Sequence, residues 1–140
     1  MTSLPQPADL TSLVLRTDFS DDAAWAVLKA AIDSRDASSA TYVSDPMYAG
    51  TTVQELADMD AAASDDDKLT YLFLADVMTM TDDEHPLLAV DLYTEPGRTF
   101  RLPPRWYADV SANLTIANLD FDEFADASDE SGTFRGLGGE

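Results

Sequence analysis

The chain has 140 residues, of which 45% are hydrophobic and 9% aromatic, and its 27 acidic against 8 basic residues give a formal net charge of −19. This length and apolar content predict one folded domain, because disordered acidic chains are poor in aromatic residues. So negative a surface argues against nucleic acid and anionic membranes as partners and favours cations or basic proteins. The sequence has no cysteine, which excludes disulfides, thiolate metal sites and cysteine nucleophiles.

Both ends of the chain are predicted to be loosely held. Residues 1–11 contain two prolines in a polar setting, and residues 129–140 end in a glycine-rich stretch. We therefore expect a single domain over residues 12–128. The N-terminal residues lack the pattern of a secretory signal, and no apolar run approaches the roughly 20 residues of a membrane helix. These features predict a cytoplasmic protein without a membrane anchor.

The first predicted elements are a strand and a helix. Residues 13–17 form a short apolar run typical of a strand, and Ser20 is a candidate N-cap for the helix that follows. The spacing of Trp25, Leu28 and Ile32 gives this helix one apolar face.

The same pattern then repeats along the chain. Residues 40–43 predict a second strand, and Thr52 with Glu55 forms a capping box that starts a second helix. Residues 69–75 are a nearly unbroken apolar run of the kind found in strands buried on both faces. We expect this third strand to lie at the centre of the sheet.

The second half predicts an antiparallel hairpin followed by two helices. After a loop rich in Thr, Met and Asp, residues 87–93 and 99–102 flank a Pro-Gly turn signal. Helical spacing resumes at Arg105, and Asp120 with Glu123 predicts a capped last helix. The fold class that follows is an α/β sandwich, with a mixed sheet of about five strands, partly parallel, covered by about four helices.

Three aspartates are candidate ligands for a divalent metal ion. Asp18, Asp45 and Asp76 each follow one of the first three strands, where sites form in parallel α/β sheets. Converging carboxylates would suit Mg²⁺ and metal-assisted hydrolysis or phosphoryl transfer. The competing interpretation, which we favour, is that aspartate is common at strand ends because it bonds nearby backbone N–H groups. No cofactor is then expected, and Mg²⁺ enters only with the alternative.

The sequence shows no catalytic motif. Its single histidine, His85, lies in an acidic loop and is expected to be exposed, and the serines lack a nucleophile elbow.

Two kinds of charged segment are candidate binding residues instead. The acidic runs are Asp65, Asp66 and Asp67, and Asp82, Asp83 and Glu84; the basic stretch holds Arg98, Arg101, Arg105 and Trp106. Arginine and aromatic residues dominate binding hot spots, but pairing of these arginines with carboxylates of the same domain is the simpler expectation.

Four segments carry a resemblance to a known family: residues 12–21, 42–46, 69–76 and 112–121. They resemble small acidic proteins with a domain of unknown function, found mainly in Streptomyces and related actinobacteria. The resemblance covers nearly the whole chain, from about Leu4 to Gly136. It implies a cytoplasmic bacterial protein and fits the Ala-rich, Lys-poor composition, but it brings no activity and no catalytic residue.

Three functions are compatible with these features. The first is a non-catalytic interaction module that binds a basic protein partner, as inhibitors, immunity proteins and nucleic-acid mimics do. The second is a metal-dependent hydrolase or a phosphoacceptor domain that uses the strand-end aspartates. The third is an accessory domain whose acidity serves only its solubility.

Overall fold

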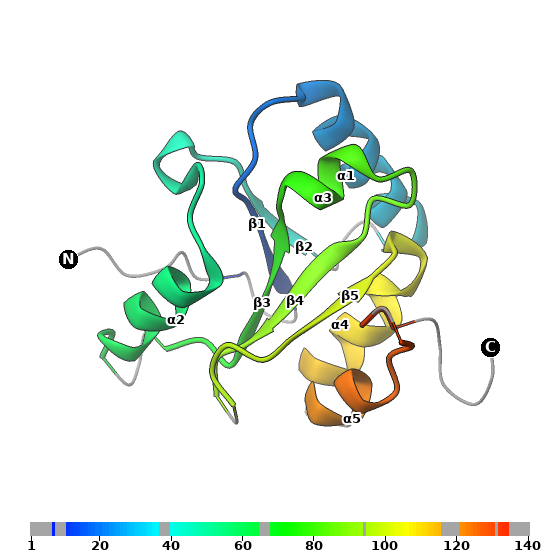
Figure 1. Ribbon diagram of the computed structural model, residues 1–140. Coiled ribbons are helices and arrows are strands. Elements are labelled where there is room, and N and C mark those ends of the chain that lie inside the picture. The colour runs from blue at the N-terminus through cyan, green and yellow to red at the C-terminus, as the bar shows by residue number, and fades with distance from the viewer. Residues whose placement is uncertain are drawn as a thin grey trace.

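The protein folds into three layers, with a central sheet between helices (Figure 1). The computed structural model describes residues 7, 11–36, 40–64, 68–93, 95–115, 121–130 and 132–134. The sheet has five strands in the order β2-β1-β3-β4-β5. Their bounds are β1 Ser12–Arg16, β2 Ala40–Val43, β3 Tyr71–Ala75, β4 Leu87–Asp91 and β5 Thr99–Leu102.

The sheet is mixed, as predicted. β1 pairs in parallel with both β2 and β3, whereas β3 and β4, and then β4 and β5, pair in antiparallel fashion. The apolar run 69–75 supplies β3, which is the middle strand. Gly97 follows β4 with a φ of 98°, and this left-handed conformation allows the turn that returns the chain into β5.

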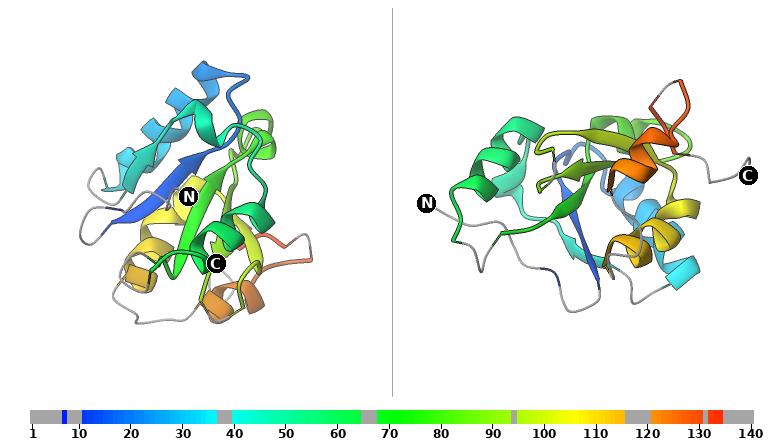
Figure 2. Two further views of the ribbon diagram at one scale, coloured as in Figure 1. Left: turned by 90° about the vertical axis from the view of Figure 1, so that its left-hand side faces the viewer. Right: turned by 90° about the horizontal axis from the view of Figure 1, so that it is seen from below.

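Helices cover both faces of the sheet. The described residues contain five α-helices, one more than we estimated, and two 3-10 helices. Their bounds are α1 Asp22–Asp36, α2 Val53–Ala61, α3 Val77–Thr81, α4 Tyr107–Thr115, α5 Phe121–Asp126, η1 Pro46–Tyr48 and η3 Pro104–Trp106. Figure 2 shows α1, α4 and α5 on one side of the sheet and α2 on the other.

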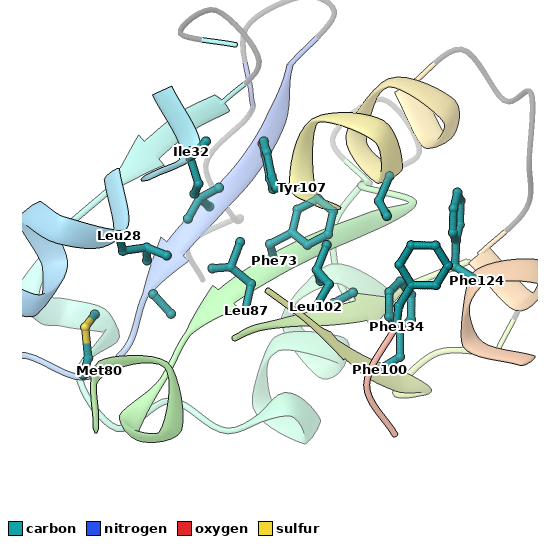
Figure 3. Packing of buried hydrophobic residues seen from close by; sticks show 14 of the residues in the cluster. Leu28, Ile32, Phe73, Met80, Leu87, Phe100, Leu102, Tyr107, Phe124 and Phe134 are labelled. Carbon is teal, nitrogen blue, oxygen red and sulfur yellow. The ribbon is translucent and has the colours of Figure 1, made fainter. Parts of the chain in front are cut away.

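The alternation of side chains along the strands divides the core in two. Val14 and Phe73 belong to the cluster formed with α1 and α4, which includes Leu28 and Tyr107. Figure 3 shows Phe73 next to Tyr107 in this cluster. Leu13, Leu15, Leu72 and Leu74 face the other way, toward Leu56 of α2. Period-two alternation on strands whose two faces are both covered explains why the sequence shows continuous apolar runs there.

The structure corrects two local predictions. The N-cap of α1 is Asp21 and not Ser20, because the Asp21 carboxylate accepts a 3.0 Å hydrogen bond from the backbone N–H of Ala24. The segment expected as a loop after β3 contains the short helix α3, which Asp76 caps. The Thr52–Glu55 capping box of α2 is confirmed in both directions.

Packed residues are also found in the C-terminal segment 129–140. Backbone hydrogen bonds join Arg101 of β5 to Gly132 and Phe134, and the Phe134 ring is buried among aromatic side chains. The predicted cap of α5 at Asp120 lies outside the described residues. None of the helices in the described part of the chain has the length and apolar character needed to cross a membrane.

Candidate functional site

The strand order reverses between β1 and β3, because β1 leads through α1 to β2 on one side while β3 leads to β4 on the other. Open α/β sheets bind their ligands at such a reversal, beyond the carboxyl ends of the strands. Here the upper end of the sheet in Figure 1 carries a hollow of about 470 Å³. Residues 17–20, 49–51 and 76–77, from three separate segments of the chain, line it.

Gly50 joins the second of these segments to the end of β1. Its backbone N–H donates a 2.8 Å hydrogen bond to the carbonyl oxygen of Thr17. Its φ of 73° lies in the left-handed region that favours glycine. The loop between β2 and α2 is thereby held against the loop that follows β1, and both form walls of one hollow.

Asp18 lines the hollow, and its carboxylate is occupied by its own loop. It accepts hydrogen bonds from the backbone N–H of Ser20 at 3.2 Å and from the Ser20 hydroxyl at 3.0 Å. This is the local Asx-type turn that aspartate forms at strand ends.

Asp76 lines the same hollow and has two structural roles. Its carboxylate accepts a 3.2 Å hydrogen bond from the backbone N–H of Thr79, which caps α3, and it forms two 2.8 Å contacts with the guanidinium of Arg101. Partial burial alone would raise the pKa of Asp76, but the Arg101 guanidinium and the Thr79 donors outweigh burial and hold that pKa below its ordinary value. The carboxylate therefore stays ionised as part of a bidentate pair.

Asp45 does not line the hollow. Its carboxylate accepts a 3.0 Å hydrogen bond from the backbone N–H of Met47 and caps η1. Burial first, and then the nearby Asp45 carboxylate, raise the pKa of the Tyr48 phenol. The structure thus brings together Asp18 and Asp76 of the three candidate metal ligands. Within the described residues, no three His, Asp or Glu side chains are placed to hold one metal ion.

The second acidic run follows α3 at the same edge of the sheet. Asp82, Asp83 and Glu84 are exposed, and the Asp82 carboxylate accepts a 2.9 Å hydrogen bond from the backbone N–H of Glu84. His85, which we expected to be exposed, is half-buried, and its Nδ1 donates to the carbonyl oxygen of Thr79 at 2.9 Å. This contact ties the acidic loop to the end of α3.

Two arginines of the basic stretch contact carboxylates of the same domain, which is the simpler of the two interpretations. Arg98 contacts Asp122 at 2.7 Å and Asp126 at 2.6 Å, and Arg101 contacts Asp76. Arg105 differs from both, because it is exposed and its guanidinium lies 4.7 Å from the centre of the Trp106 ring. The half-buried Trp106 also packs on Phe134.

The first acidic run, Asp65 to Asp67, lies outside the described residues. Lys68 follows this run and lies near the start of β3. This is the end of the sheet opposite the hollow that Asp18 lines. That end has a second hollow of about 500 Å³, whose lining includes Lys68 and the exposed Tyr93.

Sequence reasoning missed three residues that shape the strand-end edge. Arg16 is buried at the end of β1, where its side chain bonds the Asp18 carbonyl oxygen and the Asp22 carboxylate and lies over the Phe19 ring. Val77 and Met78 begin α3 with 62% and 47% of their surface exposed. An apolar pair directly after a strand-end aspartate was the signal that could have revealed them.

The fold and this edge define a three-layer α/β domain with a hollow where its strand order reverses. The chain belongs to a family described as a domain of unknown function, DUF6924, which matches residues 11–137. This match confirms the expected domain of unknown function, and like the structure it extends beyond residue 128. No curated protein matches the chain.

Proposed function

We propose that this domain is a non-catalytic interaction module that binds a basic protein partner. The observation that carries the proposal is the excess of acid. Eight basic side chains cannot neutralise 27 acidic ones, so the chain keeps a formal net charge of −19. This charge is spread over an accessible surface of 7187 Å². A field of this sign and strength steers positively charged proteins toward the surface and repels other acidic ones.

The strand-end carboxylates support binding better than catalysis. Asp18 and Asp45 accept hydrogen bonds from their own loops, and Asp76 is held by Arg101 and Thr79. A nucleophile or general base needs an accessible oxygen within reach of the reacting group. Carboxylates committed to turns, caps and an ion pair shape a surface instead.

A magnesium-dependent reaction is our second proposal, and one observation favours it: Asp18 and Asp76 face the same hollow. It would require the Asp76–Arg101 pair to open, because both carboxylate oxygens of Asp76 contact the guanidinium. The third possibility, acidity that serves only solubility, makes no use of this edge. A cytoplasmic setting stays a prediction from the cysteine-free composition, and a bacterial origin stays an implication of the family resemblance.

The test is capture of partners as a function of salt. The immobilised full chain should retain a basic protein from its source organism at low ionic strength and release it as salt rises, because salt screens exposed charges beyond about 10 Å. The Asp83→Lys/Glu84→Lys variant should retain less of the same protein. A matched Asp33→Lys/Glu130→Lys variant, with the same net charge, separates a local effect from a general one. Retention of no basic protein even at low salt would refute the proposal.

A further inference from the structure

Three features occur together where β1 and β3 end: a hollow, exposed apolar side chains and nearby carboxylates. Val77 lines the hollow, and Met78 follows it in α3. Met47 precedes the lining residues 49–51 and is 57% exposed. These are three of the five large apolar side chains that are most exposed in the described residues.

Exposed apolar side chains scattered singly need no explanation, but a group around a hollow is typical of a binding surface. Two of the three are methionines, whose flexible and polarisable side chains adapt to different occupants. The hollow of about 470 Å³ lies within the range of small ligand sites. It is large enough for one or two apolar side chains.

Carboxylates surround this apolar group. Among the lining residues of the described chain, Asp18 and Asp76 are acidic and none is basic. Asp76 is paired with Arg101, so the cations of a ligand would meet Asp18 and not Asp76. α3 has five residues at about 1.5 Å each, so the acidic loop that begins at Asp82 starts about 8 Å from Val77. Asp45, on the side of Met47, is exposed as well. A ligand whose apolar part enters the hollow therefore has negative charge on two sides.

The second hollow, near Tyr93, offers a less complementary surface. Its lining includes the cation Lys68, and the carboxylate of Asp60 there is buried and accepts a 2.7 Å hydrogen bond from the backbone N–H of Leu69. A basic ligand would meet a like charge at that hollow. Charge complementarity thus separates two cavities of similar size.

We propose that the hollow between the ends of β1 and β3 is the docking site for a segment of a basic protein in which apolar side chains lie between lysines or arginines. The apolar side chains fill the hollow against Val77, and the flanking cations face Asp45 and the Asp82–Glu84 loop. This inference rests on the proposed function, and it adds the place and the chemistry of the occupant. The contact is of the kind in which apolar anchors give affinity and charges give orientation.

The test uses three capped hexapeptides, KKLLKK, KKGGKK and EELLEE, titrated into the ¹⁵N-labelled full chain at low salt. We expect KKLLKK to shift the amide signals of Ser20, Gly50, Val77 and Met78 in a saturable way. KKGGKK should bind about tenfold more weakly, because it lacks the apolar anchor, and EELLEE should not bind.

Matched variants locate the contact. Val77→Lys should weaken KKLLKK binding about fivefold or more, because it replaces an apolar wall with a like charge. Val27→Lys, which makes the same change at a 51% exposed position of α1, should change it less than twofold. Both positions are exposed, so thermal melting should show both variants folded.

Three outcomes would overturn the docking site. They are signal shifts for KKLLKK near Tyr93 and not near Val77, equal binding of KKLLKK and KKGGKK, or no saturable binding of any hexapeptide. None of these outcomes refutes the proposed interaction with a basic protein, which the salt-dependent capture tests separately. Failure to capture any basic protein would refute that interaction itself.

Discussion

The Asp76–Arg101 pair should be the ion pair whose loss most reduces the stability of the fold. Their side chains are 22% and 18% exposed, and the pair joins the end of β3 to β5 across β4. Asp76→Ala removes the N-cap of α3, worth about 1 kcal/mol, and a charge-assisted bidentate contact worth about 2 kcal/mol. We expect the free energy of unfolding to fall by about 3 kcal/mol and Tm by about 10 °C.

The assay is equilibrium urea unfolding followed by circular dichroism, with Asp126→Ala as the matched control. That substitution also removes a carboxylate from an arginine, but Asp126 is 72% exposed and Arg98 keeps its 2.7 Å contact with Asp122. Its cost should be much smaller. A double-mutant cycle with Arg101→Met separates the pair from the cap. A cost for Asp76→Ala no larger than that for Asp126→Ala would refute this reasoning.

The same variant gives a prediction about pH. The pKa of Asp76 is lower in the folded protein than its ordinary value of 3.8, so the folded state favours the ionised carboxylate. Its contribution to stability is therefore fully present well above pH 3.8 and is lost as the pH falls through the lowered pKa. The difference between the wild type and Asp76→Ala should shrink over that acidic range. A difference that stays constant down to pH 2 would contradict the assigned pair.

Further predictions concern three other parts of the structure. Phe134→Ala should lower the free energy of unfolding by about 3 kcal/mol in urea titrations, because the ring is 2% exposed; an effect below about 1 kcal/mol would place Phe134 outside the core. Thr52→Ala should cost about 1 kcal/mol in the same assay, since it removes the capping box of α2, and an unchanged midpoint would argue against that box. Millimolar Mg²⁺ should leave the amide signals of Asp18 and Asp76 unshifted, because the Asp18 carboxylate is hydrogen-bonded to Ser20 and the Asp76 carboxylate is paired with Arg101. Saturable shifts of these signals would favour the metal-dependent alternative.

Local signals in the sequence predicted most of the elements. The capping box at Thr52 and Glu55 involves residues three apart, so nothing beyond the helix start is needed to recognise it. α3 was missed because five residues are too few to show a helical period, and two of them are threonines. Ser20 was preferred to Asp21 as the cap of α1 because both residue types suit that position and only the start of the helix decides between them.

The site was predictable only in part, for a different reason. The rule that strand ends converge placed Asp18 and Asp76 at one edge, and they do line one hollow. The partner of Asp76 could not be found in this way. Arg101 reaches it because β5 lies two strands from β3, and the strand order is a tertiary property that no local pattern encodes.

The place of β1 between β2 and β3 has a consequence for how the chain folds. Val14 pairs with Tyr42 on one side and with Phe73 on the other, 28 and 59 residues later in the chain. Such non-local parallel pairings carry a loop-closure cost before they contribute stability, and they slow folding relative to local contacts. During synthesis the first strand stays half-paired until β3 has been made. Self-repulsion among acidic chains would limit aggregation during that interval.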